Sequence, residues 1–397
     1  MSIPVVWHPQ TRLHDPRREV WVGVPTQGTE VPERVDRILT ALAEHPLIEA
    51  APQPRARLES VHAPALIDFL ASVNADWEAG PYRELVGQDR VVPYVFPTPA
   101  MTSQMSPTAA AATHGRVGEF CYDTMTLLGE GSWPAIVAAA ECALSAADLV
   151  LAGTPVAYAL SRPPGHHATP SGYGGSCYLN NAALAAQALR EGGVRRVAVV
   201  DLDAHHGNGT QAIFWDDPRV LTVSIHQDGA FPPGSGSWDE TGGPGAAGTN
   251  LNLPMPPGTG VGGYSAAFER VIVPALERFA PDFILVACGF DPGPQDPLAR
   301  LMVHSDGFRE MTARVRECAE RICDGRLALF HEGGYSRAYV PFCGLAVVEA
   351  LSGIDSGVQD PFLKGYAGFP YQSLQPLQES VIERAETQIG ETRKGDE

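Results

Sequence analysis

Residues 197–210 read VAVVDLDAHHGNGT, and this stretch decides the fold. A short run of β-branched residues that ends in polar ones is typical of a buried strand, so we predict a strand over 197–203. Similar apolar runs occur at VLTVSI (220–225), FILVACG (283–289) and LALFHEGG (327–334). The sequence therefore contains four candidate strands, and three of them run directly into acidic, histidine or tyrosine side chains.

Helical patterns separate or precede these strands. Apolar residues at helical spacing occur in AIVAAAECALSAADLVLAG (135–153), NNAALAAQALREGG (180–193) and GGYSAAFERVIVPALERFAP (262–281). Strands that alternate with helices indicate an α/β fold in which a mostly parallel central sheet is flanked by helices on both faces. We find no internal repeat and no long linker, so we predict a single domain over 1–397.

Two segments depart from this alternation. Residues 83–115 are rich in proline, serine and threonine, and we interpret them as an excursion near the site or at a subunit contact. Residues 378–397 are predicted to form a charged surface helix that frays into a tail. Neither segment is expected to belong to the central sheet.

The composition limits the possible partners. The formal net charge is -18 and no run of lysine and arginine occurs, which argues against nucleic acid or an anionic membrane as the main partner. The N-terminus lacks a basic region followed by an apolar run, and we expect no stretch long enough to cross a bilayer. The seven cysteines are scattered and odd in number, which is typical of reduced thiols, so we expect a cytoplasmic protein.

Polar residues that follow the strands are the first candidates for a site, because ligands gather beyond the carboxyl ends of parallel strands. Side chains alternate along a strand, so Asp201, Asp203 and His205 share one side at the end of the first strand. Asp291 follows another strand. Two carboxylates and one imidazole with an open fourth position describe a catalytic zinc site. The alternative is a satisfied hydrogen-bond network of buried polar residues.

Two further groups can carry chemistry. His166 and His167 lie on a loop that prolines stiffen, and one of the two can act as general base while the other stays charged. Tyr335 follows two glycines, where its hydroxyl is suited to donate to a developing oxyanion. Taken singly, a histidine pair is usually a surface feature, and a tyrosine in a glycine-rich turn usually packs.

Four ordered motifs, RPPGHH (162–167), DLDAHHGNGT (201–210), GFDP (289–292) and EGGY (332–335), resemble those of the histone deacetylase and acetylpolyamine amidohydrolase superfamily. The similarity also covers HDPRREV, EVPERVDRILTAL, VHAPALIDFL, GSW and YLNNAALAAQAL, so it spans most of the chain. The N-terminal segments look closest to bacterial acetylpolyamine amidohydrolases. The resemblance implies an arginase/deacetylase-like fold. It also implies a zinc-dependent amidohydrolase that removes an acyl group, usually acetyl, from an N-acylated amine such as an acetylpolyamine or acetyl-lysine.

The resemblance further implies one zinc ion and a structural potassium ion in each chain. The zinc ligands that it implies are Asp203, His205 and Asp291. The potassium ligands that it implies are Asp201, Asp203, His205, Ser224 and the carbonyl of Ile225.

The same resemblance implies roles for the residues that do the chemistry. Tyr335 polarises the scissile carbonyl, and His167 is the general base and acid. His166 acts electrostatically and is oriented through Asp201. Asn208 stands near His167, where some relatives carry aspartate, so the basicity of His167 is expected to differ.

The substrate tunnel shows departures from the family pattern. Gly175 and Phe231 match positions that line the tunnel. Acetylpolyamine hydrolases carry acidic residues near the tunnel mouth, but His114 and Met125 stand at those positions here. Ser176 replaces an aromatic ring that stacks on the substrate stem in relatives. We therefore expect a wider, less apolar wall and a substrate that differs from a slender alkyl amine.

Two other interpretations stay open. A di-manganese arginase-like ureohydrolase would use similar strand-end residues, and a non-catalytic module could bind acylated amines through an idle pocket. The resemblance implies a small-molecule N-acyl amine or acyl-lysine as the substrate. It also implies a homo-oligomer, a dimer or tetramer, in which the N-terminal loop and residues 83–115 narrow the entrance.

Overall fold

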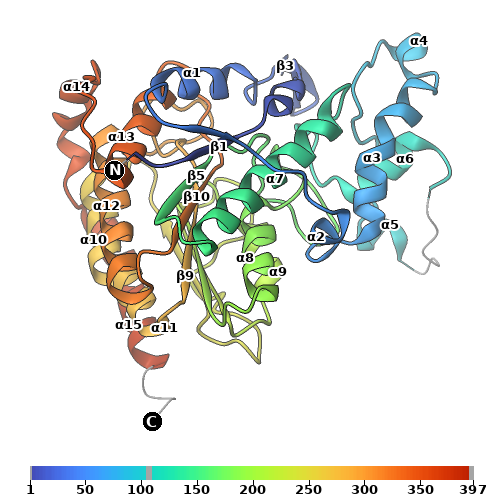
Figure 1. The fold of residues 1–397 in the computed structure, drawn as a ribbon. Coiled ribbons are helices and arrows are strands. Elements are labelled where there is room, and N and C mark those ends of the chain that lie inside the picture. Colours follow the sequence, from blue (N-terminus) through green and yellow to red (C-terminus); the bar gives the residue numbers. More distant parts are fainter. Residues whose placement is uncertain (1, 104–109, 393–397) are drawn as a thin grey trace.

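The computed structural model describes residues 2–103 and 110–392. An eight-stranded sheet with the order β4-β1-β5-β10-β9-β6-β7-β8 lies at the centre of the protein (Figure 1), and its strand pairs are all parallel. Its strands are β1 (Val5–Trp7), β4 (Leu47–Glu49), β5 (Val156–Ala159), β6 (Val197–Asp201), β7 (Val220–Gln227), β8 (Asn250–Met255), β9 (Phe283–Cys288) and β10 (Leu327–His331). The predicted α/β class is confirmed.

The four predicted strands are β6, β7, β9 and β10, and they lie side by side in the middle of the sheet. β6 ends at Asp201 and β10 at His331, earlier than predicted, because the polar residues beyond them leave the sheet. The sequence analysis missed four strands of the sheet. β1 and β4 have only three residues each, and β5 is rich in alanine. β8, at one edge of the sheet, contains asparagine and proline. It also missed an antiparallel hairpin of β2 (Arg18–Trp21) and β3 (Val24–Gln27).

Helices surround the sheet, and the three predicted ones correspond to α7, α8 and the pair α10–α11, which a π-helical turn at Phe268–Ile272 joins. The helices are α1 (Glu33–Ala41), α2 (Arg55–Glu59), α3 (Pro64–Glu78), α4 (Tyr82–Val86), α5 (Pro99–Thr102), α6 (Thr113–Phe120), α7 (Ser132–Leu151), α8 (Asn181–Glu191), α9 (Asn208–Phe214), α10 (Val261–Ala267), α11 (Val273–Phe279), α12 (Ser305–Ile322), α13 (Val340–Ser352), α14 (Leu363–Ala367) and α15 (Pro376–Thr392). Short 3₁₀ turns occur at Pro9–Leu13 and Pro370–Gln372.

Both faces of the sheet are covered. Along β6, Val197 and Val199 pack in a core with α7 and α8, whereas Ala198 and Val200 pack on the other face with α1, α10, α12 and α13. Figure 1 shows α7 and α8 on one side of the strands and α12 and α13 on the other. Because the side chains on both faces of these strands are buried, the strands appear in the sequence as continuous apolar runs.

Helix α7 corrects one expectation. Its 20 residues, Ser132–Leu151, are long and apolar enough to cross a membrane by length and composition, although no such stretch was expected. In the folded protein 72% of its most apolar window is buried, against β5, α8 and the arm described below. A helix that is apolar on all sides is typical of a core helix in a large domain.

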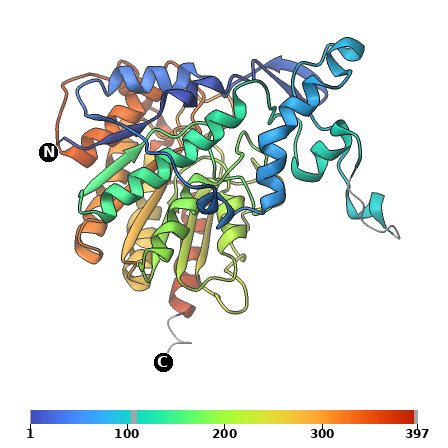
Figure 2. The ribbon, with the colours of Figure 1, turned by 45° about the vertical axis from the view of Figure 1, so that its right-hand side comes forward.

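Helices α3 to α6 form an arm that extends beyond the sheet, on the right in Figures 1 and 2. The arm has its own apolar cluster, in which Leu70, Trp77 and Val117 pack with Tyr173 and one side of α7. The predicted excursion at 83–115 falls on this arm. Its residues 104–109 lie outside the part of the chain that the structure describes.

The C-terminal segment, predicted as a charged surface helix that frays into a tail, contains helix α15, but this helix is not confined to the surface. Ile382 of this helix is fully buried, and Arg270 forms ion pairs with Glu379 and Glu386. The helix packs along β8, the edge strand of the sheet. Its buried residues Ile382 and Ala385 belong to the same apolar core as Leu251 of β8. Residues 393–397 lie beyond the described part of the chain.

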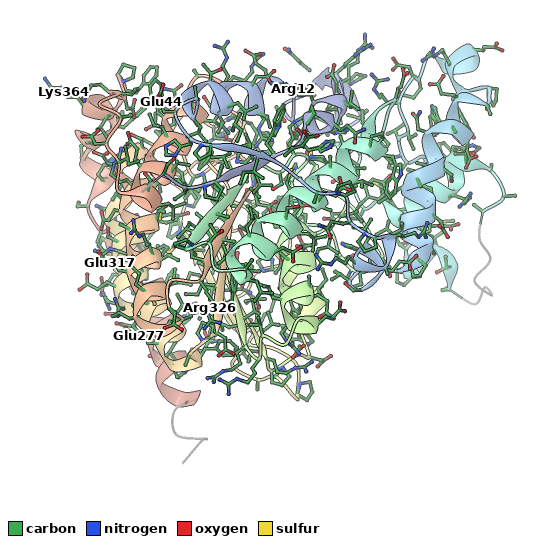
Figure 3. The ribbon with its side chains drawn as sticks, in the orientation of Figure 1. Arg12, Glu44, Glu277, Glu317, Arg326 and Lys364 are labelled. Atoms are coloured by element: carbon green, nitrogen blue, oxygen red, sulfur yellow. The ribbon has the colours of Figure 1, made fainter. Side chains whose placement is uncertain are left out.

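Charged side chains lie on the outside of the helical layers. Figure 3 labels Glu277 and Glu317 on the outer surface of α11 and α12, and Arg321 pairs with Glu277 at 2.7 Å. Both carboxylates are exposed to solvent.

Candidate active site

The candidate residues lie beyond the carboxyl ends of adjacent strands. The strands β5, β10, β9 and β6 follow one another across the sheet. His166 and His167 follow β5, Tyr335 follows β10, Asp291 follows β9, and Asp203 and His205 follow β6. The chain order is different, so the fold brings together residues that are far apart in sequence.

The three predicted zinc ligands converge. His205 Nδ1 lies 3.0 Å from Asp203 Oδ1 and 3.0 Å from Asp291 Oδ2. Ligand atoms of all three residues lie within 4.8 Å of one another, and all three residues are buried. Three nitrogen and oxygen ligands with one position left open for water or substrate are typical of a catalytic zinc site.

The backbone orients both carboxylates toward this point. The Gly333 N–H donates to Asp203 Oδ2 at 2.8 Å, and the Ala204 N–H donates to Asp291 Oδ1 at 2.7 Å. A side chain at Gly333 would bring its Cβ within 2.3 Å of Asp291 Oδ2, so only glycine leaves the carboxylates their place. The residues fit a divalent cation.

The pKa values of these ligands also indicate a site for a divalent cation. Burial, together with the negative charge of Asp203, raises the pKa of Asp291 to about 8. Burial acts to lower the pKa of His205, but the charges of Asp291 and Asp203 outweigh it and raise that pKa well above its usual range. Without a metal, Asp291 and His205 hold protons that their ordinary pKa values would not predict. A divalent cation supplies positive charge that would release them.

The two histidines of the pair differ in charge. His166 Nδ1 lies 2.9 Å from Asp201 Oδ2, and His167 Nδ1 lies 2.8 Å from Asn208 Oδ1. Burial acts to lower the pKa of His166, but Asp201 and Asp203 raise it to about 10. Burial and the neighbouring charge of His166 lower the pKa of His167 well below its usual range. His166 therefore keeps a proton, and His167 is neutral and able to accept one.

Tyr335 is fixed from two sides. Its backbone N–H donates to Asp296 Oδ2 at 2.6 Å, and the guanidinium carbon of Arg34 lies 4.6 Å from the centre of its ring. Burial raises the pKa of Tyr335 well above its usual range, although Arg34 opposes this shift. The hydroxyl therefore keeps its proton and can donate a hydrogen bond.

A cavity of about 510 Å³ leads to these residues. Its lining includes His167, His205 and Tyr335 and all four predicted substrate-binding residues, Gly175, Ser176, Met125 and Phe231. The hairpin β2–β3 forms one wall through Glu19, Trp21, Thr26 and Gln27. The sequence analysis did not predict this wall.

The position of His114 differs from the expectation. The residue does not line the cavity; it lies on the arm, where its Nδ1 is 3.0 Å from the hydroxyl of Tyr82. Met125 does line the cavity, as expected from the alignment of motifs. The mouth of the cavity in one chain is therefore formed without His114.

Gly175 has a position that no larger residue could occupy. Its φ is +57°, and a Cβ there would lie 2.2 Å from the ring of His167 and 2.7 Å from that of Phe231. The ring of Phe231 meets that of His167 edge-on, with centroids 4.9 Å apart. Phe231 thus forms an apolar wall directly beside the candidate base.

Comparison with known proteins agrees with this geometry. The histone deacetylase domain family matches residues 28–351. The histone deacetylase-like amidohydrolase of Pseudomonas aeruginosa is 49% identical over 267 residues, which are 66% of this chain and 70% of that protein. The acetylpolyamine amidohydrolase of Burkholderia pseudomallei is 40% identical over 76% of this chain and 86% of its own length. A crystal structure of acetylpolyamine aminohydrolase from Burkholderia pseudomallei has a TM-score of 0.81 at 35% identity and covers 88% of this chain and 99% of its own.

This chain belongs to the histone deacetylase family. It is a deacetylase or amidohydrolase that acts on non-peptide amide bonds, as the resemblance implied. The match separates it from the arginase-like enzymes and from a non-catalytic binding module, the two alternatives that the sequence left open.

The structure of this deacetylase adds functional residues that the sequence analysis missed. Glu332 Oε2 accepts hydrogen bonds from the N–H groups of Gly165 at 2.6 Å and His166 at 3.1 Å, and so fixes the histidine loop. Asp296 and Arg34 fix Tyr335. Glu332 lies in the EGGY motif, and Asp296 follows GFDP closely, so proximity to the motifs was the only signal in the sequence.

The residues implied for potassium lie close to the zinc ligands in this deacetylase. Asp201 of β6 is paired with Ser224 of β7, and Ile225 follows on the same strand. Asp203 and His205 follow β6 directly. Potassium itself stays a prediction.

Proposed function

We propose that this chain is a zinc-dependent deacylase that removes an acetyl group from an N-acylated amine. One observation carries the proposal: His205 Nδ1 lies 3.0 Å from a carboxylate oxygen of Asp203 and of Asp291, at the end of a cavity that a neutral His167 and a protonated Tyr335 also line. Asp203, His205 and Asp291 would hold the zinc.

When bound, zinc would polarise the acyl carbonyl and make a water molecule more acidic. His167 donates from Nδ1 to Asn208, which leaves its Nε2 free to accept the proton of the attacking water. The Tyr335 hydroxyl donates a hydrogen bond to the oxyanion that develops at the acyl carbonyl oxygen. His166 stays protonated between Asp201 and Asp203 and stabilises the negative charge nearby.

The leaving amine must be protonated before the carbon–nitrogen bond breaks. His167 holds the proton that it accepted from water and can return it to the amine nitrogen. The products are then acetate and a free amine. Phe231, edge-on to His167, keeps bulk water away from this proton transfer.

A substitution at Tyr335 tests the assigned roles. Tyr335→Phe should keep one zinc per chain, measured by elemental analysis, and lower kcat on an acetylated amine by about a hundredfold or more, because one oxyanion donor is lost. Asp291→Ala should lose zinc and turnover together. Full turnover by the phenylalanine variant, or turnover by a metal-free chain, would contradict the proposal.

We further infer a homo-oligomer in which the arm helps to narrow the entrance of a neighbouring cavity. The support is the projection of the arm, with the exposed side chains of Tyr94 and Met101, and the exposure of Trp21 and Val22 on the hairpin. Sedimentation velocity tests this: a single monomeric species at micromolar concentration would refute it. The cytoplasmic location stays a prediction.

A further inference from the structure

The cavity mouth carries little charge. Among the residues that line the cavity, the charged side chains other than the two histidines are those of Glu19 and Arg300. The position where acidic residues were expected from the family pattern holds Met125, and Leu298 and Ser176 add no charge. The balance between Glu19 and Arg300 therefore decides which charged substrates the mouth attracts.

Glu19 is poorly placed to attract a cation. Its side chain is 6% exposed, and its Oε1 accepts hydrogen bonds from the Thr29 N–H at 2.6 Å and from the Thr29 hydroxyl at 2.8 Å. Burial raises the pKa of Glu19 above its usual value, although the hydrogen bonds from Thr29 oppose this shift. The contacts with Thr29 hold it in the hairpin wall.

Arg300 is exposed and has no acidic partner in the described chain. The sequence has 46 acidic residues against 28 lysines and arginines, and most described arginines form an ion pair, as Arg270 does with Glu379 and Glu386. Arg300 Nη1 instead donates to the carbonyls of Pro297 at 3.1 Å and Ala299 at 2.7 Å. A cation at the mouth is thus left without a counter-charge in an acidic protein.

The Arg300 side chain is also held in place. The two carbonyl contacts fix one end of the guanidinium. The backbone N–H of Arg300 donates to Gln227 Oε1 at 2.6 Å, which positions the main chain at this residue. A guanidinium that is held in one orientation loses little entropy when it binds a carboxylate through its remaining donors. The site is therefore arranged for an anion before the substrate arrives.

We propose that Arg300 binds a carboxylate at the far end of the substrate, so that the preferred substrates are ω-N-acyl amino acids. In such a molecule the acyl amide lies at the metal site, an alkyl chain passes Leu298 and Met125, and the carboxylate pairs with the guanidinium at the mouth. This inference rests on the proposed deacylase function and narrows its substrate class. A polyamine, which has only cationic ends, gains nothing from Arg300.

Two substrates that differ only by the carboxylate test the inference: Nε-acetyl-L-lysine and N-acetylcadaverine. The zinc-loaded wild type should have a kcat/KM about three- to tenfold higher for acetyl-lysine, chiefly through KM, as expected for one partly exposed ion pair. Arg300→Gln should remove this preference and leave the kcat/KM for acetylcadaverine unchanged or higher. Arg337→Gln, which removes an exposed arginine paired with Glu33 outside the cavity, is the matched control.

The outcomes separate the two proposals. Equal kcat/KM for both substrates in the wild type, or an equal loss for both in Arg300→Gln, would overturn the carboxylate subsite while leaving the deacylase function intact. If neither substrate is hydrolysed, the deacylase function is in question, and calorimetric titration with the same pair still decides the subsite by the ratio of the two Kd values. A peptide that ends in acetyl-lysine with a free carboxylate, compared with the same peptide with an amidated C-terminus, shows whether the C-terminal carboxylate of a peptide can bind Arg300.

Discussion

At the scale of single residues, the site depends on which hydrogen bond each histidine makes. His166 faces a carboxylate, that of Asp201, whereas His167 faces the amide of Asn208. An amide oxygen accepts the Nδ1–H without a full negative charge, so it orients the ring but does little to raise its basicity. This difference, together with burial and the charge of His166 beside His167, separates a charged histidine from a neutral one.

The substitution Asn208→Asp should make the two histidines more alike. A carboxylate beside His167 Nδ1 raises the pKa of that ring, so His167 should become protonated at a higher pH. The acid limb of the profile of kcat/KM against pH should then move to higher pH, because the base must be neutral to act. Asn208→Gln is a control without added charge. An unchanged acid limb in the aspartate variant would show that His167 is not the base.

Asp296 should act through Tyr335. Its carboxylate accepts the N–H groups of Tyr335 at 2.6 Å and Leu298 at 2.9 Å, one on each oxygen. Asp296→Asn replaces one of these oxygens by an amide NH2 group, which cannot accept a hydrogen bond, so one of the two contacts is lost. We expect kcat to fall about tenfold as the hydroxyl loses its position. In a Tyr335→Phe background the same change should have little effect on kcat. Additive losses in the double variant would mean that Asp296 serves only general stability.

At the scale of elements, the sequence predicted the strands that lie in the middle of the sheet and missed those outside them. β6, β7, β9 and β10 are long enough to show an apolar run, but the three residues of β1 are not. The ligands and the tyrosine were found because they directly follow such runs. The contact of Asp296 with Tyr335 joins residues that are 39 positions apart, and that of Arg34 with the Glu332 carbonyl joins residues that are 298 positions apart. A local sequence pattern cannot predict contacts of this kind.

The start of α8 depends on a neutral histidine. The backbone N–H of Asn180, which caps this helix, donates to His62 Nε2 at 2.8 Å, and the other ring nitrogen, Nδ1, lies 3.0 Å from the Thr169 carbonyl. Burial lowers the pKa of His62 to about 4, against an ordinary pKa of 6.5 for histidine in an unfolded chain. Protonation would remove the acceptor that the Asn180 N–H needs.

The free energy of unfolding should therefore fall as pH drops from about 6.5 to about 4. In this range the unfolded chain binds a proton at His62 and the folded chain does not, and the stabilisation is fully present above pH 6.5. Urea unfolding at pH 7, 5.5 and 4.5 measures the slope. His62→Gln should be less stable at pH 7 but show a smaller loss toward acid. An identical slope in this variant would rule out His62 as a contributor.

At the scale of the whole molecule, the metal should stabilise the fold as well as the reaction. Its three ligands follow β6 and β9, so a bound ion ties two neighbouring strand ends together. A ligand that binds only the folded state raises the free energy of unfolding by about 2.7 kcal/mol when its concentration is a hundredfold above its Kd. Chelator should therefore lower Tm and abolish turnover, and added zinc should restore both. A Tm that does not respond to chelator or zinc would argue against a metal at this place.

The position of β10 sets the order in which the protein can be completed during synthesis. This last strand, Leu327–His331, inserts between β5 and β9. Until it leaves the ribosome, the nascent chain consists of two half-sheets whose facing edges have unsatisfied backbone groups. Each edge could recruit a strand from another molecule, so slow translation of the codons between β9 and β10 should favour aggregation. Chaperones that shield such edges should raise the yield of folded enzyme.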